Sequence, residues 1–230
     1  MSKLLVEERQ MVVPGQVLAE GMDYLPGDLV LRDKDVLVSQ VVGVVGVNGR
    51  LIRITPLAGT YVPKAGDIVI GKVVAVGFSG WRIDIGWAFE ANLGLKDASS
   101  DFIDKGSDLT KYFAVGDYLL TQIVNVASTK IIDVGMKGPG LRKLSPGRIF
   151  NVGAMKVPRI IGKQGSMISL IKEYTGCKVS VGQNGTVWLS GDNVENELLA
   201  INAIELIEKE SYTSGLTERV KTFLEKNKNG

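Results

Sequence analysis

The stretch Ile160-Ile161-Gly162-Lys163-Gln164-Gly165-Ser166 decides the fold of this chain. Four apolar residues between Met167 and Tyr174 share one face of the helix that follows, and Gly176 ends that helix. Glycines at both ends of the four-residue loop let another backbone approach without obstruction from Cβ atoms. The amides of Gln164, Gly165 and Ser166 are expected to open onto the helix N-terminus, where phosphate is favoured, and Lys163 adds a cation. The stretch therefore predicts a loop that contacts a phosphate backbone.

Strands and helices alternate around this loop in a definite order. We expect a strand at 148–152, a short helix before the loop, strands at 178–181 and 186–190, and a final helix at 193–210. The turn Gly182-Gln183-Asn184-Gly185 joins the last two strands. The expected apolar face of the final helix comprises Val194, Leu198, Ile201, Ile204 and Ile207.

This order, together with the I-I-G-x-x-G string, resembles the type I KH RNA-binding domain. The resemblance implies a three-stranded sheet with three helices. We expect bases to lie on an apolar floor drawn from Ile160, Ile161 and Val179. The implied RNA-binding residues are Arg148, Arg159, Ile161, Gly162, Lys163, Gln164, Gly165 and Ser166.

Positive charge is concentrated around the loop. Segment 137–178 holds nine basic residues and one acidic residue, Glu173, whereas the whole chain has a net charge of only +2. The remainder of the chain is therefore acidic, with a net charge of about −6. A local excess of this kind suits a polyanion such as single-stranded RNA, although many basic runs are only solvated surface.

The amino-acid composition excludes most classes of enzyme. The 230 residues are 45% hydrophobic and 23% charged, as in ordinary globular proteins, and include no histidine and one cysteine, Cys177. Without histidine, histidine-based nucleophilic pairs and general bases are excluded, and one cysteine excludes an intrachain disulfide and a thiolate metal cage. We expect Cys177 to be a small buried residue. The sequence predicts no catalytic residue, no metal site and no cofactor.

The segments that direct a chain to or through a membrane are not evident. No apolar run reaches the length of a membrane span, and Glu7, Glu8 and Arg9 lie where a signal peptide would have its apolar core. Together with the single cysteine, these features predict a cytoplasmic protein without a membrane partner.

Residues 1–145 are predicted to be mostly β structure. Three Gly-Asp turns, at 27–28, 66–67 and 116–117, each precede β-prone residues and predict the start of a strand. The first domain, residues 1–64, contains the valine-rich run 41–47 followed by Asn48-Gly49, a hairpin turn signal. Its charges cancel, and we expect a β-rich amino-terminal docking domain.

The second domain, residues 65–145, is expected to be a five-stranded OB barrel. Strands are predicted at 67–76, 81–85, 91–95, 118–126 and 130–134, and five short strands suit a small closed barrel. Aromatic residues interleaved with basic ones are typical of single-strand binding surfaces, where each stacked base contributes about 1–3 kcal/mol. Trp81 and Phe113 suit the barrel core equally well. The candidate RNA-binding residues here are Phe78, Trp81, Arg82, Lys111 and Tyr112.

The order of the domains narrows the choice of protein family. Gly71-Lys72-Val73-Val74 and segment 78–86 resemble the opening hairpin of the S1-type OB domain, with Trp81 and Arg82 in place of the usual paired aromatics. A β-rich domain, this barrel, and a KH domain with a helical tail (146–230) together resemble the RNA-binding cap subunits of the archaeal exosome. That resemblance implies a non-catalytic subunit, present in three copies on a hexameric ring of phosphorolytic exoribonuclease subunits. It implies capture of single-stranded RNA and guidance of its 3′ end into the ring for degradation and processing.

Two other functions remain open. A free-standing RNA-binding regulator, or a translation or transcription factor, could contain the same domains without a degradative partner. A nuclease with carboxylate-bound magnesium would use some of the 25 Asp and Glu residues, although no carboxylate cluster lies in a site context. Cleavage of RNA by the purified chain with magnesium alone would favour the nuclease.

Overall fold

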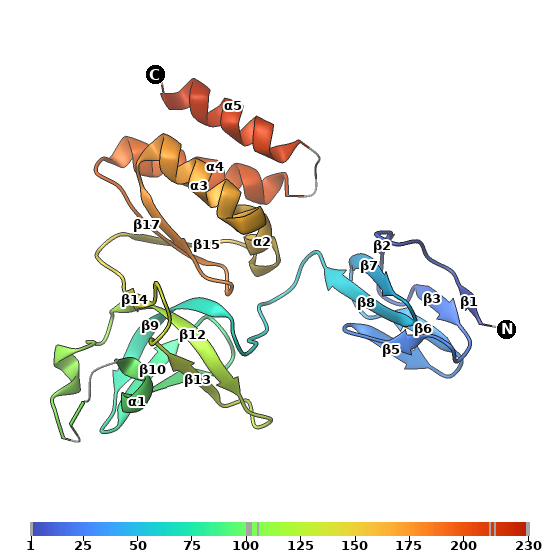
Figure 1. Ribbon diagram of the computed structural model, residues 1–230, viewed down its shortest axis with the longest axis horizontal. Coiled ribbons are helices and arrows are strands. Elements are labelled where there is room, and N and C mark those ends of the chain that lie inside the picture. The colour runs from blue at the N-terminus through green and yellow to red at the C-terminus, as the bar shows by residue number, and fades with distance from the viewer. Residues whose placement is uncertain (1, 100–102, 105, 212, 214, 229–230) are drawn as a thin grey trace. The chain divides into compact units, whose positions relative to one another are not determined.

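The computed structural model describes residues 2–99, 103–104, 106–211, 213 and 215–228. The chain forms two compact units, Met1–Gly59 and Thr60–Gly230. Strands make up the first unit and the first half of the second, and helices dominate the end of the chain (Figure 1). The predicted α+β class is confirmed, with a β-rich amino-terminal domain, a barrel and a KH fold in that order.

The first unit is a pair of four-stranded sheets with one core. Their strand orders are β1-β3-β6-β5 and β2-β7-β8-β4, and Leu18, Leu37 and Ile52 are fully buried in the core. The predicted hairpin is present, because Asn48 of β7 pairs with Leu51 of β8. The strands are β1 (Lys3–Leu4), β2 (Met11–Val12), β3 (Val17–Glu20), β4 (Leu25–Pro26), β5 (Val30–Asp33), β6 (Val36–Ser39), β7 (Gly43–Asn48) and β8 (Leu51–Pro56).

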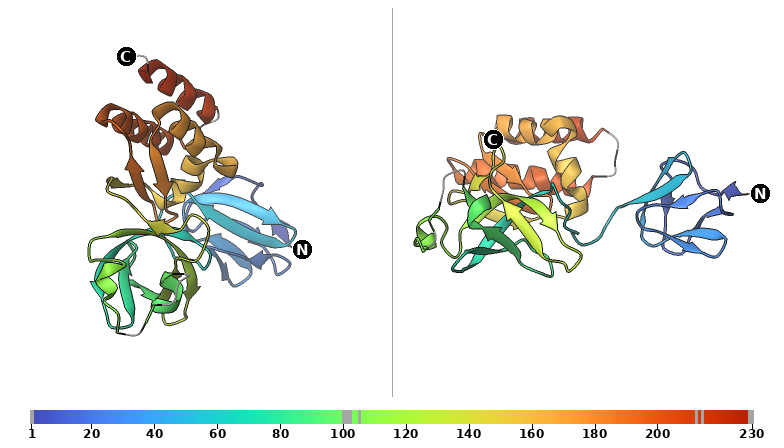
Figure 2. Two further views of the ribbon diagram at one scale, coloured as in Figure 1. Left: turned by 60° about the vertical axis from the view of Figure 1, so that its left-hand side comes forward. Right: turned by 60° about the horizontal axis from the view of Figure 1, so that its bottom comes forward.

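The second unit begins with a closed five-stranded barrel. It closes because β13 pairs with β11 in parallel and with β12 antiparallel, while β9 pairs with both β10 and β12 (Figure 2, left). All five predicted strands are present, and the short β14 adds to β12. The elements are β9 (Ile68–Val76), β10 (Gly80–Asp84), β11 (Ala91–Gly94), α1 (Leu95–Ala98), η1 (Leu109–Lys111), β12 (Tyr118–Val126), β13 (Ile132–Gly135) and β14 (Arg142–Lys143).

The three Gly-Asp turns start strands as predicted, at β5, β9 and β12. Asp67 and Asp117 each accept a hydrogen bond from the backbone amide three residues earlier, at 3.2 and 2.8 Å. Gly66 and Gly116 have φ angles of 94° and 97°, which residues with a Cβ rarely adopt. Side-chain capping and left-handed glycine together fix both turns.

The rest of this unit is a type I KH fold. Its sheet has the order β15-β17-β16, and α2, α3 and α4 cover one face of it (Figures 1 and 2). α5 packs against α3 and α4 as a helical tail. The elements are β15 (Arg148–Asn151), η2 (Ala154–Lys156), α2 (Val157–Ile161), η3 (Lys163–Gly165), α3 (Ser166–Thr175), β16 (Lys178–Val181), β17 (Thr186–Ser190), α4 (Val194–Lys209) and α5 (Leu216–Lys228).

The helix α4 buries a different face from the one predicted. Val194 and Leu198 are 56% and 47% exposed, and Ile201 is only half-buried. The buried residues of α4 are Leu199, Ala200, Ala203, Ile204 and Ile207. The predicted face was wrong at its first three positions because α4 carries two apolar stripes. The stripe with two alanines is the one buried, since small side chains allow a close approach to neighbouring elements.

The turn Gly182-Gln183-Asn184-Gly185 joins the KH sheet to the barrel. The Asn184 Nδ2 donates hydrogen bonds to the carbonyls of Ile70 and Ile85 at 2.8 and 2.9 Å. The Gln183 amide donates to the Ile68 carbonyl at 2.8 Å. A Cβ on Gly182 would lie 2.6 Å from the Ile70 amide nitrogen, so glycine is required for this close approach.

Trp188 of β17 completes this junction from the opposite face of the KH sheet to the helices. It packs in a buried cluster with Ile70, Leu120 and Leu144, and its Nε1 donates to the Ser145 carbonyl at 2.9 Å. Hydrogen bonds and apolar packing together hold the barrel and the KH fold in one compact unit.

Candidate nucleic-acid interface

The two glycines of the predicted loop have different roles. Gly162 has a φ of 77° and a ψ of 172°, and a Cβ there would lie 2.7 Å from the Met167 amide nitrogen. Gly165 has a φ of 80°, but only the Ile168 side chain lies near its missing Cβ, at 3.9 Å. Gly162 is therefore needed for packing against the start of α3. Only Gly165 leaves open space for an approaching backbone, which corrects the expectation for Gly162.

Two of the three amides expected to bind phosphate are used within the loop. The Gly165 amide donates to the Gly162 carbonyl at 3.2 Å, and the Ser166 amide donates to the Lys163 carbonyl. The expectation that all three amides open outward is therefore wrong for Gly165 and Ser166. The side chains of Lys163, Gln164 and Ser166 are exposed, so they and the Gln164 amide remain the candidates for phosphate contact.

The apolar floor predicted beneath the bases is smaller than expected. Ile160 and Val179 are buried in the KH core, so their assignment to the floor is wrong. Ile161, at the end of α2, is only half-buried, and Arg159 beside it is exposed. The structure thus brings together Arg159, Ile161 and the loop 162–166 as one surface. Cys177 is buried as predicted, and burial raises the pKa of its thiol above the ordinary value.

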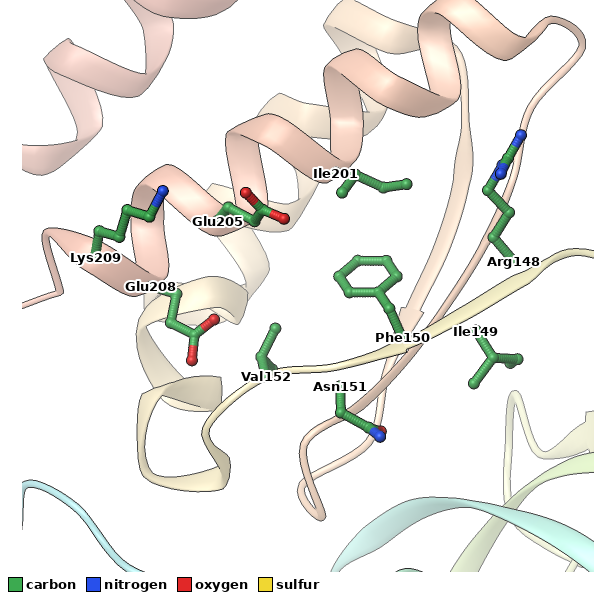
Figure 3. A pocket seen from close by; sticks show the side chains of 9 residues that line it. All are labelled: Arg148, Ile149, Phe150, Asn151, Val152, Ile201, Glu205, Glu208 and Lys209. Carbon is green, nitrogen blue, oxygen red and sulfur yellow. The ribbon is translucent and has the colours of Figure 1, made fainter.

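Arg148 lies apart from this surface. It belongs to β15 (Figure 3), the sheet edge opposite β16. Its Nε donates to Glu197 of α4 at 2.5 Å. The bond from Arg148 holds the pKa of the Glu197 carboxyl below its ordinary value. The assignment of Arg148 to the loop site is corrected, because its guanidinium pairs within the protein at the β15 edge of the sheet.

In the barrel, Trp81 belongs to the core. Its side chain is 2% exposed, its Nε1 donates to the Phe113 carbonyl at 2.9 Å, and the Phe113 ring packs edge-on at 5.2 Å between centroids. The suggestion that Trp81 stacks on bases is therefore wrong. Lys111 and Tyr112, on and just after η1, have exposed side chains.

Two adjoining clefts cross the outer face of β10 and β11. Arg82 and Asn92 are paired across these strands and line both clefts. Phe78, 83% exposed, lies in the β9–β10 loop between Gly77 and Ser79, which line one cleft, and Phe89, 56% exposed, lines the other. The remaining residues of the second cleft are Ala88, Glu90, Thr129, Lys130 and Ile131. The clefts therefore form one track from Phe78 across Arg82 to Phe89.

Sequence reasoning found Phe78 and Arg82 but missed Phe89, Asn92 and Lys130. A signal for Phe89 was present in its place in the connection between two strands, although Trp87 in the same connection packs against the barrel core. Asn92 and Lys130 carried no such signal, since the pairing of β10 with β11 and the return of the β12–β13 loop bring them to Arg82. An ion pair of 3.3 Å joins Arg82 to Glu90 across this face.

Other kinds of site have little support in the described parts of the chain. Among these residues, no group of three His, Cys, Asp or Glu side chains is placed to hold a metal ion. None of the described helices is both long and apolar enough to cross a membrane.

The fold and these surfaces define a class of protein: a chain that joins an S1-type OB barrel to a KH domain, two domain types that bind single-stranded RNA. Residues 148–206 match the KH domain family, and residues 60–102 match the family described as RRP4, S1 domain. The chain belongs to the Rrp4 family of exosome complex components.

Relatives along almost the whole chain establish this membership. The exosome complex component Rrp4 of Thermococcus kodakarensis is 44% identical over 97% of this chain and 88% of its own length. The protein of the same name from Methanothermus fervidus is 42% identical over 96% of this chain and 97% of its own. A crystal structure assigned as an exosome complex RNA-binding protein superposes with a TM-score of 0.65 at 36% identity, covering 74% of this chain and 98% of that one.

Proposed function

We propose that this chain is a non-catalytic RNA-binding subunit of an exosome. It captures single-stranded RNA and guides the 3′ end into a ring of phosphorolytic exoribonuclease subunits. Two single-strand-binding domains joined in one compact unit by the 182–185 turn are the observation that carries this function. The relatives named as exosome components, similar over 97% of the chain, support the same assembly here.

Each surface has a distinct part in holding the strand. At the KH loop, Lys163 and Arg159 neutralise phosphates, the open side of Gly165 admits the RNA backbone, and Ile161 supports a base. On the barrel, Arg82 lines both clefts, and Phe78 and Phe89 stack on bases. Lys111 and Tyr112 guide the strand at the loop before β12.

The assembly follows the same division of the chain. Residues 1–64 dock on a hexameric ring, residues 65–145 of three copies surround its central opening, and residues 146–230 bind RNA farther out. Single-stranded RNA and the ring are the partners, and the complex acts in the cytoplasm. The chain itself contributes no catalytic residue and requires no cofactor.

The assembly is tested by gentle purification of the protein from its own cells. Native mass and RNA degradation are measured on the same sample, with and without phosphate. A large assembly that shortens RNA only with phosphate is expected. A lone chain of 24.8 kDa that binds RNA without partners would instead favour a free-standing regulator, the alternative function for the same domains.

The KH loop is tested by replacing Lys163 and Gln164 together, each by Asp. Affinity for single-stranded RNA should fall at least tenfold, and unchanged affinity would mean that the loop is only a turn. The matched control is Lys226→Asp with Asn227→Asp on α5, the same residue classes and charge change at exposed positions. If about three phosphates are neutralised, log affinity of the unmodified chain should fall with log salt at a slope of about −2.

The barrel track is tested separately by Phe78→Ala and Phe89→Ala. Each should weaken RNA binding by about 1–3 kcal/mol, the usual contribution of one stacked base. Val124→Ala, an exposed apolar position on β12, is the control and should leave affinity unchanged. Equal affinities of all three variants for RNA would mean that the track does not contact RNA.

A further inference from the structure

Gly94, the last residue of β11, is a glycine that the fold does not require. Its φ and ψ angles are −79° and 158°, an extended conformation that any residue adopts. A Cβ at this position would meet no atom within 4 Å. Among the glycines that the structure describes, Gly94 alone combines an ordinary φ angle with open space around the missing side chain. Neither backbone strain nor packing therefore explains this glycine.

The short helix α1 and the sheet do not explain Gly94 either. It caps α1 without a side-chain hydrogen bond, which serine, aspartate or asparagine would supply there. β10 and β11 pair without a shift of register, so there is no bulge between them to accommodate. Glycine also loses more conformational freedom on folding than other residues. A glycine in a strand without such a reason marks a place where a ligand or another backbone approaches closely.

The partner of Gly94 across the sheet is a second glycine, Gly80, which packing does explain. A Cβ on Gly80 would lie 2.2 Å from the Leu93 carbonyl oxygen. The pairing of Gly80 with Gly94 places two residues without side chains next to each other. Their exposed peptide groups form a bare patch of backbone on the barrel.

This bare patch lines the cleft that Arg82 and Asn92 also line, which has a volume of about 320 Å³. That volume is at the lower end of the range for ligand pockets, roughly 300–1,000 Å³, and suits a single nucleoside. Along β10, Ser79 of the Phe78 loop precedes Gly80, and Arg82 follows it. The patch therefore lies inside the track between Phe78 and Arg82.

The polar groups beside the patch are available to a ligand. Arg82 pairs with Glu90 at 3.3 Å, but the two side chains are 67% and 47% exposed, and an ion pair this exposed contributes little. Asn92 has an exposed side chain whose amide offers both donors and an acceptor. A polypeptide strand cannot add to β11, because β10 and β13 already pair with it on its two sides. A flat ring with a nearby phosphate is the ligand that fits these groups.

We propose that Gly94 is a base-contact position, where one nucleobase of the bound RNA lies flat on the backbone of Gly80 and Gly94. The inference rests on the proposed function, because it names the nucleotide contact inside the track between Phe78 and Phe89. Asn92 faces the edge of this base, and Arg82 attracts the adjoining phosphate. A side chain at position 94 would hold the base away from both. The missing Cβ therefore sets how closely the strand approaches the barrel.

Gly94→Val tests this contact with two measurements on one variant. Its affinity for single-stranded RNA should fall at least tenfold, because the branched side chain occupies the place of the base. Its thermal midpoint should not fall, since valine suits an extended backbone with open space around it. Gly46→Val on β7 is the matched control, because a Cβ there makes only ordinary contacts with Arg53, and it should leave RNA affinity unchanged. Unchanged affinity in Gly94→Val, or a midpoint below that of the control, overturns the proposal.

Protection of a cysteine tests the placement of the base directly. Gly94→Cys should react with a thiol reagent in the free protein, and a saturating concentration of a short oligouridylate should slow this reaction at least tenfold. Val124→Cys, at an exposed position of β12, is the control and should react equally fast with and without RNA. The native Cys177 is buried and does not compete. Equal labelling of Gly94→Cys with RNA bound would exclude the contact.

These tests separate this contact from the proposed function. If Phe78→Ala weakens RNA binding while Gly94→Val does not, only the base contact at Gly94 is wrong. If the unmodified chain binds no single-stranded RNA, the proposed function fails and the base contact fails with it.

Discussion

The hydrogen bonds of Asn184 make a quantitative prediction about the junction between the barrel and the KH fold. Its Nδ2 donates to the carbonyls of Ile70 and Ile85, and its Oδ1 accepts from the Ile70 amide at 3.3 Å. Ile70 and Ile85 are each 1% exposed, so their backbone groups have little access to water. Asn184→Ala removes the donor to both carbonyls at once.

The size of the effect follows from these contacts. Each lost hydrogen bond costs about 0.5–1.5 kcal/mol net, and a carbonyl that stays dry costs more. Asn184 is itself only partly buried, so water will satisfy one of the two carbonyls in part. We therefore expect the free energy of unfolding to fall by about 2–3 kcal/mol in Asn184→Ala. Asn184→Asp should lose more at neutral pH, because a carboxylate oxygen would face the carbonyls in place of the amide donor.

Urea unfolding followed by tryptophan fluorescence measures this loss, since Trp188 reports on the junction and Trp81 on the barrel core. Asn202→Ala, at an exposed position of α4, is the control and should change stability by less than about 0.5 kcal/mol. If Asn184→Ala matches that control, the turn contributes no stability and the account of the junction is wrong.

Three further results are expected from local geometry. Gly162→Ala should lower the free energy of unfolding by about 1–3 kcal/mol, because its backbone conformation is restricted to glycine and a Cβ would displace Met167. Gly165→Ala should lower it less, by about 1–2 kcal/mol. Thermal unfolding that shows the reverse order would contradict this. The buried Cys177, whose pKa burial raises, should react with a thiol reagent only after unfolding, and labelling of the native chain at the rate of a free thiol would refute its burial. Because Arg148 lowers the pKa of Glu197, the stability this pair contributes is present above the ordinary glutamate pKa of 4.5 and is lost as pH falls through the lower folded value. In Arg148→Met, the free energy of unfolding should therefore fall less steeply as the pH is lowered below 4.5. An unchanged dependence on pH would mean that the pair contributes no stability in solution.

Most predictions about turns and strands, which depend on neighbouring residues, were confirmed, whereas the outward amides expected at Gly165 and Ser166 were wrong for an equally local reason, the hydrogen bonds within the loop. The Gly-Asp turns, the Asn48-Gly49 hairpin and the positions of the five barrel strands follow from turn chemistry and from the alternation of apolar residues, which act within a few positions. The burial of Trp81 was also accessible, because Trp81, Ile83 and Ile85 alternate with polar Arg82 and so mark the inner face of β10. This alternation is stronger evidence that Trp81 is buried than a nearby basic residue is evidence that it stacks on bases.

Predictions that depend on distant residues were wrong or incomplete. α4 carries two apolar stripes, and its own pattern does not say which one meets the sheet. Arg148 lies close to Lys163 in sequence, but it belongs to the β15 edge and pairs with Glu197. The basic segment 137–178 therefore does not form a single surface.

By itself the sequence determined the family, the succession of a β-rich domain, a barrel and a KH fold, and the position of the glycine-bounded loop 162–165, because the I-I-G-x-x-G string and the strand pattern specify local backbone geometry. Only the tertiary structure decided which residues of those motifs face outward. It set Asn92 and Lys130 beside Arg82, paired Arg148 with Glu197, and fixed the 182–185 turn on β9, about a hundred residues earlier in the chain. These outcomes come from the packing of segments far apart in sequence, and packing selects among faces that local propensity leaves equivalent.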